Sequence, residues 1–207
     1  MGLIMDFVAI DFETATPQWT SICSVGMCVV ENNKIVKTVG TLIKPVPFEF
    51  NDYNIAIHGI TPQMVWNKPT FEQLWDRIRP YIDGKLVIAH NASFDMGAMK
   101  KTLEMFGIPL PTFDYLCTVK LSQKAYPQLT SHKLNVMGDA FGIDFSHHTA
   151  CDDAYVCAEI LLHIIKDFGI NSLEELEERF DIGIGKMCEG FSEPCRKNKK
   201  AKAAVKR

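Results

Sequence analysis

The 207-residue sequence contains no uninterrupted run of about 18 apolar residues, the length that a membrane-spanning helix requires. Asp6 interrupts the apolar start of the chain, so no secretory signal is apparent. No C-x-x-C pair occurs, and the seven cysteines, an odd number, lie mostly inside apolar segments. We therefore expect a cytoplasmic protein without membrane contact, whose cysteines are reduced thiols rather than disulfides or zinc ligands.

Charge is distributed unevenly along the chain. Seven of the 22 Lys and Arg residues lie in Arg196–Arg207, which contains no acid, while the other 15 share the preceding sequence with 25 acids. An acidic body argues against non-specific coating of DNA. The tail has the composition of a disordered basic arm, which either contacts nucleic acid or serves only as a solubilising terminus.

Three segments near the N-terminus have the alternating pattern of strands. Phe7–Glu13 is followed by Ser24–Val30 and Lys34–Ile43, which are joined by a polar turn, so the pattern predicts an antiparallel meander. Residues 44–70 contain four prolines and predict loop and short turns. Leu86–Ala89 is wholly apolar, as is typical of a central strand that is buried on both faces.

Apolar residues at helical spacing predict helices over 71–82, 93–106 and 150–168, and a short helix from 172 to about 180. Thr70, Thr149 and Ser172 are the expected N-caps. The pattern of 112–145 is less regular and favours one helix over 115–126 and another over 133–141. No internal repeat and no second core are apparent.

Two carboxylates share one face of the first predicted strand. Asp11 and Glu13 are two residues apart, so their backbone positions are about 6.6 Å apart and their side chains point the same way. Both can reach one cluster of hard divalent ions, which prefer carboxylate oxygen. The alternative is that the strand simply becomes polar where it nears the surface.

Two further acids, Asp95 and Asp153, begin predicted helices that must pack on the same sheet. A helix N-terminus favours an acid through the macrodipole alone, so each could be only a helix-start residue. Their convergence on Asp11 would nevertheless complete a metal site. His148, and equally its neighbour His147, lies close enough to Asp153 to accept a proton from water or to face solvent in a loop.

Four segments together resemble a known family. They are Phe7–Thr14 (FVAIDFET), His58–Thr61 (HGIT), Ala89–Asp95 (AHNASFD) and His148–Ala154 (HTACDDA). In this order they resemble the histidine branch of the DEDD superfamily of 3′-to-5′ exonucleases, the DnaQ-like group to which the proofreading epsilon subunit of bacterial DNA polymerase III belongs. The resemblance implies an α/β, ribonuclease H-like fold in which helices flank a mixed five-stranded sheet.

The resemblance also implies the division of the chain. It covers an exonuclease domain over residues 1–168, followed by a short C-terminal helical extension over 169–195 and the basic, disordered tail over 196–207. The extension matches no known polymerase-binding segment, so a polymerase or repair partner is not identified.

The family's site residues can be carried over one by one. Asp11, Glu13, Asp95 and Asp153 match the acids that bind two divalent ions, Mg or Mn, and His148 matches the general base because it stands five residues before the last aspartate. The positions that match the terminal-nucleotide pocket are Phe12, Thr14, His58, Ile60, Thr61, Asn91 and Phe94. For Phe12, Ile60 and Phe94, ordinary core packing is the alternative.

The implied function is hydrolysis of the terminal phosphodiester at single-stranded 3′ ends or frayed DNA, with release of nucleoside 5′-monophosphates. An exoribonuclease that trims RNA ends or oligoribonucleotides is an alternative, because no residue can be assigned to the 2′-hydroxyl. A non-catalytic nucleic-acid-binding module is a third reading, which the complete set of acids argues against. The absence of a His-Asp dipeptide disfavours an HD-type phosphohydrolase.

Overall fold

A three-stranded antiparallel meander begins the chain, as the alternation predicts. In the computed structural model, which describes residues 4–196, β1 (Phe7–Thr14) pairs with β2 (Ile22–Glu31), and β2 pairs with β3 (Lys34–Leu42). Asn32 and Asn33 form the turn between β2 and β3 and both have positive φ, a conformation that asparagine tolerates better than most residues.

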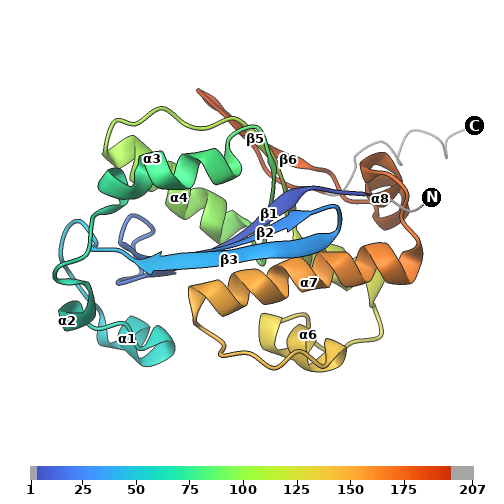
Figure 1. Ribbon diagram of the computed structural model, residues 1–207, viewed down its shortest axis with the longest axis horizontal. Coiled ribbons are helices and arrows are strands. Elements are labelled where there is room, and N and C mark those ends of the chain that lie inside the picture. Colours follow the sequence, from blue (N-terminus) through green and yellow to red (C-terminus); the bar gives the residue numbers. More distant parts are fainter. Residues whose placement is uncertain (1–3, 197–207) are drawn as a thin grey trace, which may run out of the picture.

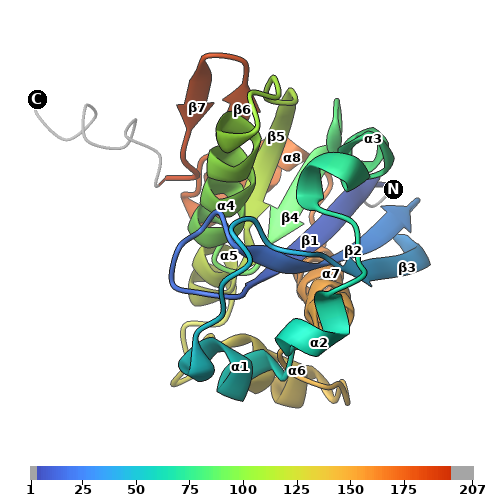
Figure 2. The ribbon, with the colours of Figure 1, turned by 90° about the vertical axis from the view of Figure 1, so that its left-hand side faces the viewer.

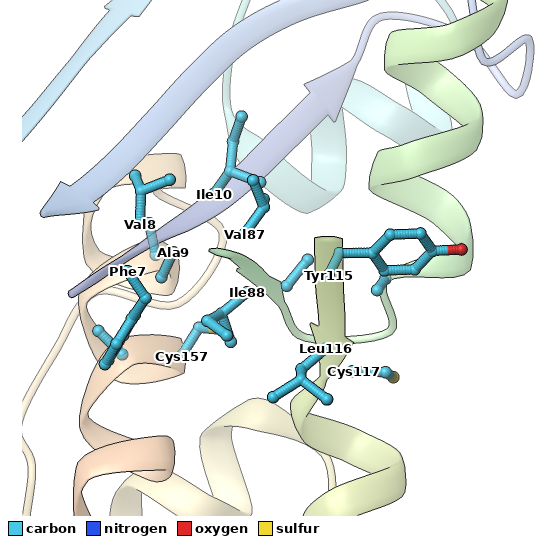
Figure 3. Packing of buried hydrophobic residues seen from close by; sticks show 14 of the residues in the cluster. Phe7, Val8, Ala9, Ile10, Val87, Ile88, Tyr115, Leu116, Cys117 and Cys157 are labelled. Carbon is cyan, nitrogen blue, oxygen red and sulfur yellow. The ribbon is translucent and has the colours of Figure 1, made fainter. Parts of the chain in front are cut away.

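The sheet continues on the other side of β1 with parallel strands. β4 (Leu86–Ala89) pairs with β1 and β5 (Phe113–Cys117) pairs with β4, both in parallel. Side chains of these three central strands form much of the core, together with Cys157 from the helix below them (Figure 3). The wholly apolar pattern of β4 is thus explained by burial on both faces.

The sheet has seven strands rather than the five expected, in the order β3-β2-β1-β4-β5-β6-β7. β6 (Gly185–Cys188) and β7 (Phe191–Glu193) extend the far edge by antiparallel pairing. Strands of four and three residues show too few alternations to be predicted from periodicity.

The predicted helix over 115–126 is wrong in its first part. Residues up to Cys117 belong to β5, and the helix α5 begins only at Thr118. No glycine, proline or polar turn separates the two elements, so the sequence lacks the punctuation that normally marks a boundary.

Helices cover both faces of the sheet. Figure 1 shows α7 running along one face and α3 and α4 along the other, while α6 lies below α7. The helices of the described residues are α1 (Asp52–His58), α2 (Pro62–Val65), α3 (Phe71–Ile82), α4 (Ser93–Met105), α5 (Thr118–Ala125), α6 (Leu134–Phe141), α7 (Ala150–Phe168) and α8 (Leu173–Phe180).

Helix boundaries largely follow the predicted caps. Thr70 and Gln73 form a capping box at the start of α3, and the Ser172 side chain accepts a hydrogen bond from the backbone N–H of Glu175. Thr149 occupies the N-cap position of α7, although its side chain makes no capping hydrogen bond. Within residues 44–70, where loop was predicted, the structure adds the short helices α1 and α2 around His58–Thr61.

No helix of residues 4–196 combines the length and the apolar composition that crossing a bilayer demands. The basic tail over 196–207, which the sequence predicts either to contact nucleic acid or to serve as a solubilising terminus, lies outside the described residues except for Arg196.

Candidate active site

A cleft of about 710 Å³ opens where β1 and β4 end. Its walls come from β1, from the start of α4, from α5 and α6, and from the segment that leads into α7. In Figure 2, α4 and α5 lie on one side of β1 and α7 on the other, with α6 below them. Three of the predicted acids, Asp11, Glu13 and Asp153, line the cleft together with His148.

The acids converge. Asp11 and Glu13 lie on β1 and Asp153 lies in the first turn of α7, and carboxylate oxygens of the three lie within 4.8 Å of one another. Asp95, in the first turn of α4, is 1% exposed, and its Oδ1 accepts a hydrogen bond from the backbone N–H of Phe12 at 3.1 Å. This bond attaches Asp95 to β1 at Phe12, the residue between Asp11 and Glu13.

A glycine allows α7 to approach the strand acids. Gly26 of β2 stands opposite Asp11 in the β1–β2 register. A Cβ at this position would overlap the backbone of Ala150 and Cys151, so α7 begins in direct contact with the sheet. Because Asp153 follows within the same turn, the missing side chain at Gly26 sets how closely the acids of strand and helix can meet.

Burial raises the pKa of every acid in the cluster, and repulsion between the acids adds to the shift at Asp11, Glu13 and Asp95. Desolvation is the main cause at Asp11, whose pKa lies well above its ordinary value, with further repulsion from Asp95 and Asp153. Desolvation likewise raises the pKa of Glu13 to about 8 and that of Asp95 above its usual range. At Asp153 burial raises the pKa, while a hydrogen bond with His147 opposes the shift.

The two adjacent histidines contact Asp153 differently. The Nδ1 of His147 lies 3.1 Å from Asp153 Oδ1, whereas His148 donates its backbone N–H to Oδ2 at 3.0 Å. The two rings stack with centroids 3.8 Å apart, and His148 has a φ of 68°. Burial, followed by the neighbouring His147, lowers the pKa of the His148 imidazole, so this ring is neutral at lower pH than an ordinary histidine.

Three of the residues expected in the nucleotide pocket line the cleft, namely Phe12, Asn91 and Phe94. The Phe12 ring itself packs edge-to-face on Phe71 in the core, as strand alternation from Asp11 requires. Asn91 has a φ of 69° and accepts a hydrogen bond from the Ser93 hydroxyl at the start of α4.

The other four expected pocket residues are not among those that line the cleft. Thr14 is buried, and its carbonyl accepts hydrogen bonds from Asn54 and from the Nε2 of His58, the latter at 3.2 Å. Ile60 is buried in a small second cluster with Ala15, Cys23 and Val65. Thr61 is the N-cap residue of α2.

Sequence reasoning missed one wall of the cleft. This wall consists of Val119, Gln123, His132, Lys133, Leu134 and Asn135, with His90 beneath it. The His90 ring hydrogen-bonds to the Thr118 hydroxyl and to the His132 carbonyl, both at 2.9 Å, and burial lowers its pKa to about 4. His90 could have been predicted, because it lies within the AHNASFD motif. The other residues of this wall lie within 112–145, where the hydrophobic pattern is irregular.

The site fits a divalent cation. Asp95 Oδ2 is buried and has no hydrogen-bond partner within the described part of the chain, and it lies beside three converging carboxylates. Four acids whose pKa values are raised mainly by burial, so that a bound cation would offset the cost of ionising them, form a ligand set suited to a hard cation.

Comparisons with known proteins agree with this geometry. A family model described as "Exonuclease" matches residues 8–161. A PolC-type DNA polymerase III of Thermotoga maritima is 32% identical over 182 residues, which cover 84% of this chain and 13% of that protein. The 3′-5′ exonuclease DinG of Bacillus subtilis is 30% identical over 164 residues, which cover 77% and 18% of the two chains.

The fold has a counterpart among solved structures. Exonuclease X in complex with 5′-overhanging duplex DNA superposes with a TM-score of 0.68 at 27% identity, and the match covers 84% of this chain and 99% of that one. The chain spans only a small part of the PolC-type and DinG proteins, and this part is an exonuclease domain. The resemblance to the DEDD exonucleases is thus confirmed, and the chain belongs to this exonuclease family.

Proposed function

We propose that the protein is a metal-dependent 3′-to-5′ exonuclease that hydrolyses the terminal phosphodiester of single-stranded or frayed DNA and releases nucleoside 5′-monophosphates. The observation that carries the proposal is the cluster of Asp11, Glu13 and Asp153 around one point of an open cleft, with the unpartnered Asp95 oxygen beside them. Such a cluster of buried carboxylates is unfavourable unless protons or cations offset its charge, and bound cations would in turn attract a phosphate chain.

The four acids would hold two divalent ions, Mg or Mn. When bound, the ions neutralise charge on the scissile phosphate and stabilise the departing 3′ oxygen. Asp95 can serve without rearrangement, because its hydrogen bond to Phe12 already fixes the carboxylate. The zinc-bound form of an E. coli ExoI–ssDNA complex shares only the fold with this chain, at 16% identity and a TM-score of 0.65.

The roles of the two histidines follow from their contacts. Within the described residues, the His148 ring makes no hydrogen bond, and its lowered pKa leaves it neutral and able to take a proton from the attacking water. His147 is committed to Asp153 through Nδ1 and supports the ring of His148 by stacking. We therefore assign the general base to His148 and a positioning role to His147.

The remaining pocket residues would bind the terminal nucleotide. Asn91 and Phe94 face the cleft and can contact it directly. The pocket residues outside the cleft lining would contribute indirectly, by fixing the end of β1 and the turn before α2 near which the nucleotide would lie. They are Thr14, His58, Ile60 and Thr61. Phe12 would contribute through its backbone, since its ring is in the core.

The chain's wider context is also a proposal. Its relatives include PolC-type DNA polymerases III and DinG, so a polymerase or repair partner is consistent with them. We propose that the exonuclease domain ends at residue 168, because none of the described residues after it, up to Arg196, lines the cleft, and β6 and β7 instead extend the sheet edge at β5.

Digestion of end-labelled substrates tests this function. Single-stranded DNA, duplex DNA and RNA of one sequence should be incubated side by side with Mg²⁺, with Mn²⁺ and with chelator. We expect mononucleotide release from the 3′ end of single-stranded DNA, dependent on the metal. Undiminished activity in chelator would refute the metal site, and preference for RNA would identify an exoribonuclease instead.

A further inference from the structure

Trp19 is a partly exposed aromatic side chain next to the cleft. Trp19 is 37% exposed and lies in the loop 15–21, directly after β1. The buried Ser21 organises this loop: its hydroxyl donates to the Gln18 carbonyl at 2.6 Å and accepts from the Thr16 backbone N–H at 3.0 Å. In addition, the backbone N–H of Ala15 donates a hydrogen bond to the Ser21 carbonyl at 2.8 Å. Trp19 is therefore presented by an ordered turn.

The helix beside this loop is shaped to receive the indole. A Cβ at Gly97 of α4 would overlap the six-membered ring of Trp19, so only glycine leaves room for it. Lys101 lies one turn further along the same helix face, with its Nζ 4.4 Å from the ring centroid. Glycine is a poor helix former, yet it occupies the middle of α4 at the point of contact.

Trp19 continues the aromatic surface of the cleft. Its ring meets that of Phe94 edge-to-face, with centroids 6.1 Å apart, and Phe94 lines the cleft that contains the acids. An oligonucleotide whose 3′ end lies at the acids must leave the cleft past one of its walls. On the Phe94 side it would meet an exposed indole and an ammonium group.

We propose that Trp19 is a stacking platform for an unpaired base on the 5′ side of the terminal nucleotide, with Lys101 close to the phosphate of the same nucleotide. The inference rests on the proposed function, which places the 3′ end at the acids. Stacking needs a flat π-surface and reads no sequence, and a lysine supplies the charge that the phosphate chain requires. An unpaired base fits this pair of groups better than a protein segment does, because Lys101 complements phosphate.

Tryptophan fluorescence provides a direct test, because the chain has only three tryptophans. Trp75 is buried, and Trp66 is exposed elsewhere, next to Phe48 and Lys44. The full chain should be titrated with an octathymidylate in calcium, without Mg²⁺ or Mn²⁺. We expect quenching that persists in Trp66→Leu and is absent in Trp19→Leu.

Affinity provides the magnitude. From the usual contribution of one stacked base, we expect Trp19→Leu to bind the oligonucleotide roughly five- to 150-fold more weakly, Trp19→Phe to recover most of the loss, and Trp66→Leu to bind as the wild type does. Equal affinity of Trp19→Leu and the wild type, or quenching that disappears only with Trp66→Leu, would overturn the platform.

A small substrate separates this inference from the proposed function. The p-nitrophenyl ester of thymidine 5′-monophosphate has no second base, so its hydrolysis tests the acids alone. Trp19→Leu should lower kcat/KM for the octamer at least fivefold more than for the ester, mainly through KM. Failure of the wild type on both substrates would refute the exonuclease, while the fluorescence titration would still decide the platform.

Discussion

The protein has two clefts of similar size that differ in charge. The acid cleft described above measures about 710 Å³, and a second cleft of about 640 Å³ lies between the β2–β3 turn and the later turns of α7. The second cleft contains Lys34, Lys166 and Glu159, and the Oε2 of Glu159 lies 3.7 Å from Nδ1 of His163. Of the described residues that line it, Glu159 is the one acid and two are lysines.

The acid cleft has an excess of acids, because Asp11, Glu13 and Asp153 share its lining with Lys133 alone among lysines and arginines, and of the three only Asp153 is paired with a histidine. Desolvation raises the pKa values of its carboxylates, and repulsion from the other acids adds to the shift at Asp11 and Glu13. The same helix, α7, contributes to both clefts, with Asp153 at its start and Glu159 further along. The two clefts therefore have similar volumes and share helix α7. The excess of buried carboxylates distinguishes the acid cleft, as a site for cations, from an ordinary surface depression.

Acid-to-amide substitutions in the two clefts should give the largest contrast. Asp11→Asn or Asp153→Asn removes a ligand charge while preserving the shape of the side chain, so we expect kcat/KM on single-stranded DNA to fall about a thousandfold. Glu159→Gln, the matched change in the second cleft, should leave the rate within twofold. Rates would be measured with saturating Mn²⁺ as well as Mg²⁺. A similar loss of kcat/KM in Asp11→Asn, Asp153→Asn and Glu159→Gln would show that the acid cleft is not the catalytic one.

Substitution of the stacked histidines should give the next largest effect. We expect His148→Ala to lower kcat by about a hundredfold or more, since a general base is lost, and His147→Ala to lower it less than tenfold, since only the orientation of Asp153 and of the His148 ring is affected. Single-turnover rates would measure the chemical step. His163→Ala in the second cleft is the control. A greater loss at His147 than at His148 would show that the base is His147.

The stability of the metal-free protein should show the smallest effect, and the size of this effect depends on pH. Glu13 has a pKa of about 8 in the fold, above its ordinary 4.5, so the stability it contributes is present below about pH 4.5 and is lost as the pH rises through 8. Glu13→Gln cannot ionise. In chelator its Tm should therefore increasingly exceed that of the wild type from pH 5 to pH 8.5, by about 2–4 °C for each kcal/mol relieved.

Two controls sharpen this measurement. Glu159→Gln should show no such trend with pH. Adding Mn²⁺ at pH 8 should raise the Tm of the wild type more than that of Glu13→Gln, because the cation offsets the repulsion that the amide has already removed. A pH-independent difference between Glu13→Gln and the wild type would contradict the electrostatic explanation.

The sequence predicts those parts of the fold in which local pattern and tertiary environment agree. The alternating pattern of Phe7–Glu13 corresponds to β1, which is buried except where Asp11 and Glu13 are partly exposed. The apolar stripe of α7 predicts its boundaries, Ala150–Phe168, correctly. β5 was missed because Phe113–Cys117 runs into α5 without a turn signal. β6 and β7 were missed because pairing with an existing sheet edge, rather than periodicity, makes such short segments strands.

The site shows the same division. Motif spacing identified Asp11, Glu13, Asp95 and Asp153, and the fold brings three of them within 4.8 Å and places Asp95 against β1. The wall that contains Lys133 was not predicted. Its position depends on a long-range hydrogen bond between the His90 ring and the His132 carbonyl, which connects segments 42 residues apart and leaves no local pattern.

Gly26 bears on how natural sequences of this kind are interpreted. It belongs to none of the four motifs, yet a methyl group there would push the first turn of α7 away from the sheet that carries Asp11. A homologue can therefore retain every acid and the histidine and still have lost its chemistry through a larger residue at this one place. A search for the catalytic residues alone would classify such a homologue as an active enzyme. The size of the residue at the position of Gly26 on β2 would classify it as inactive.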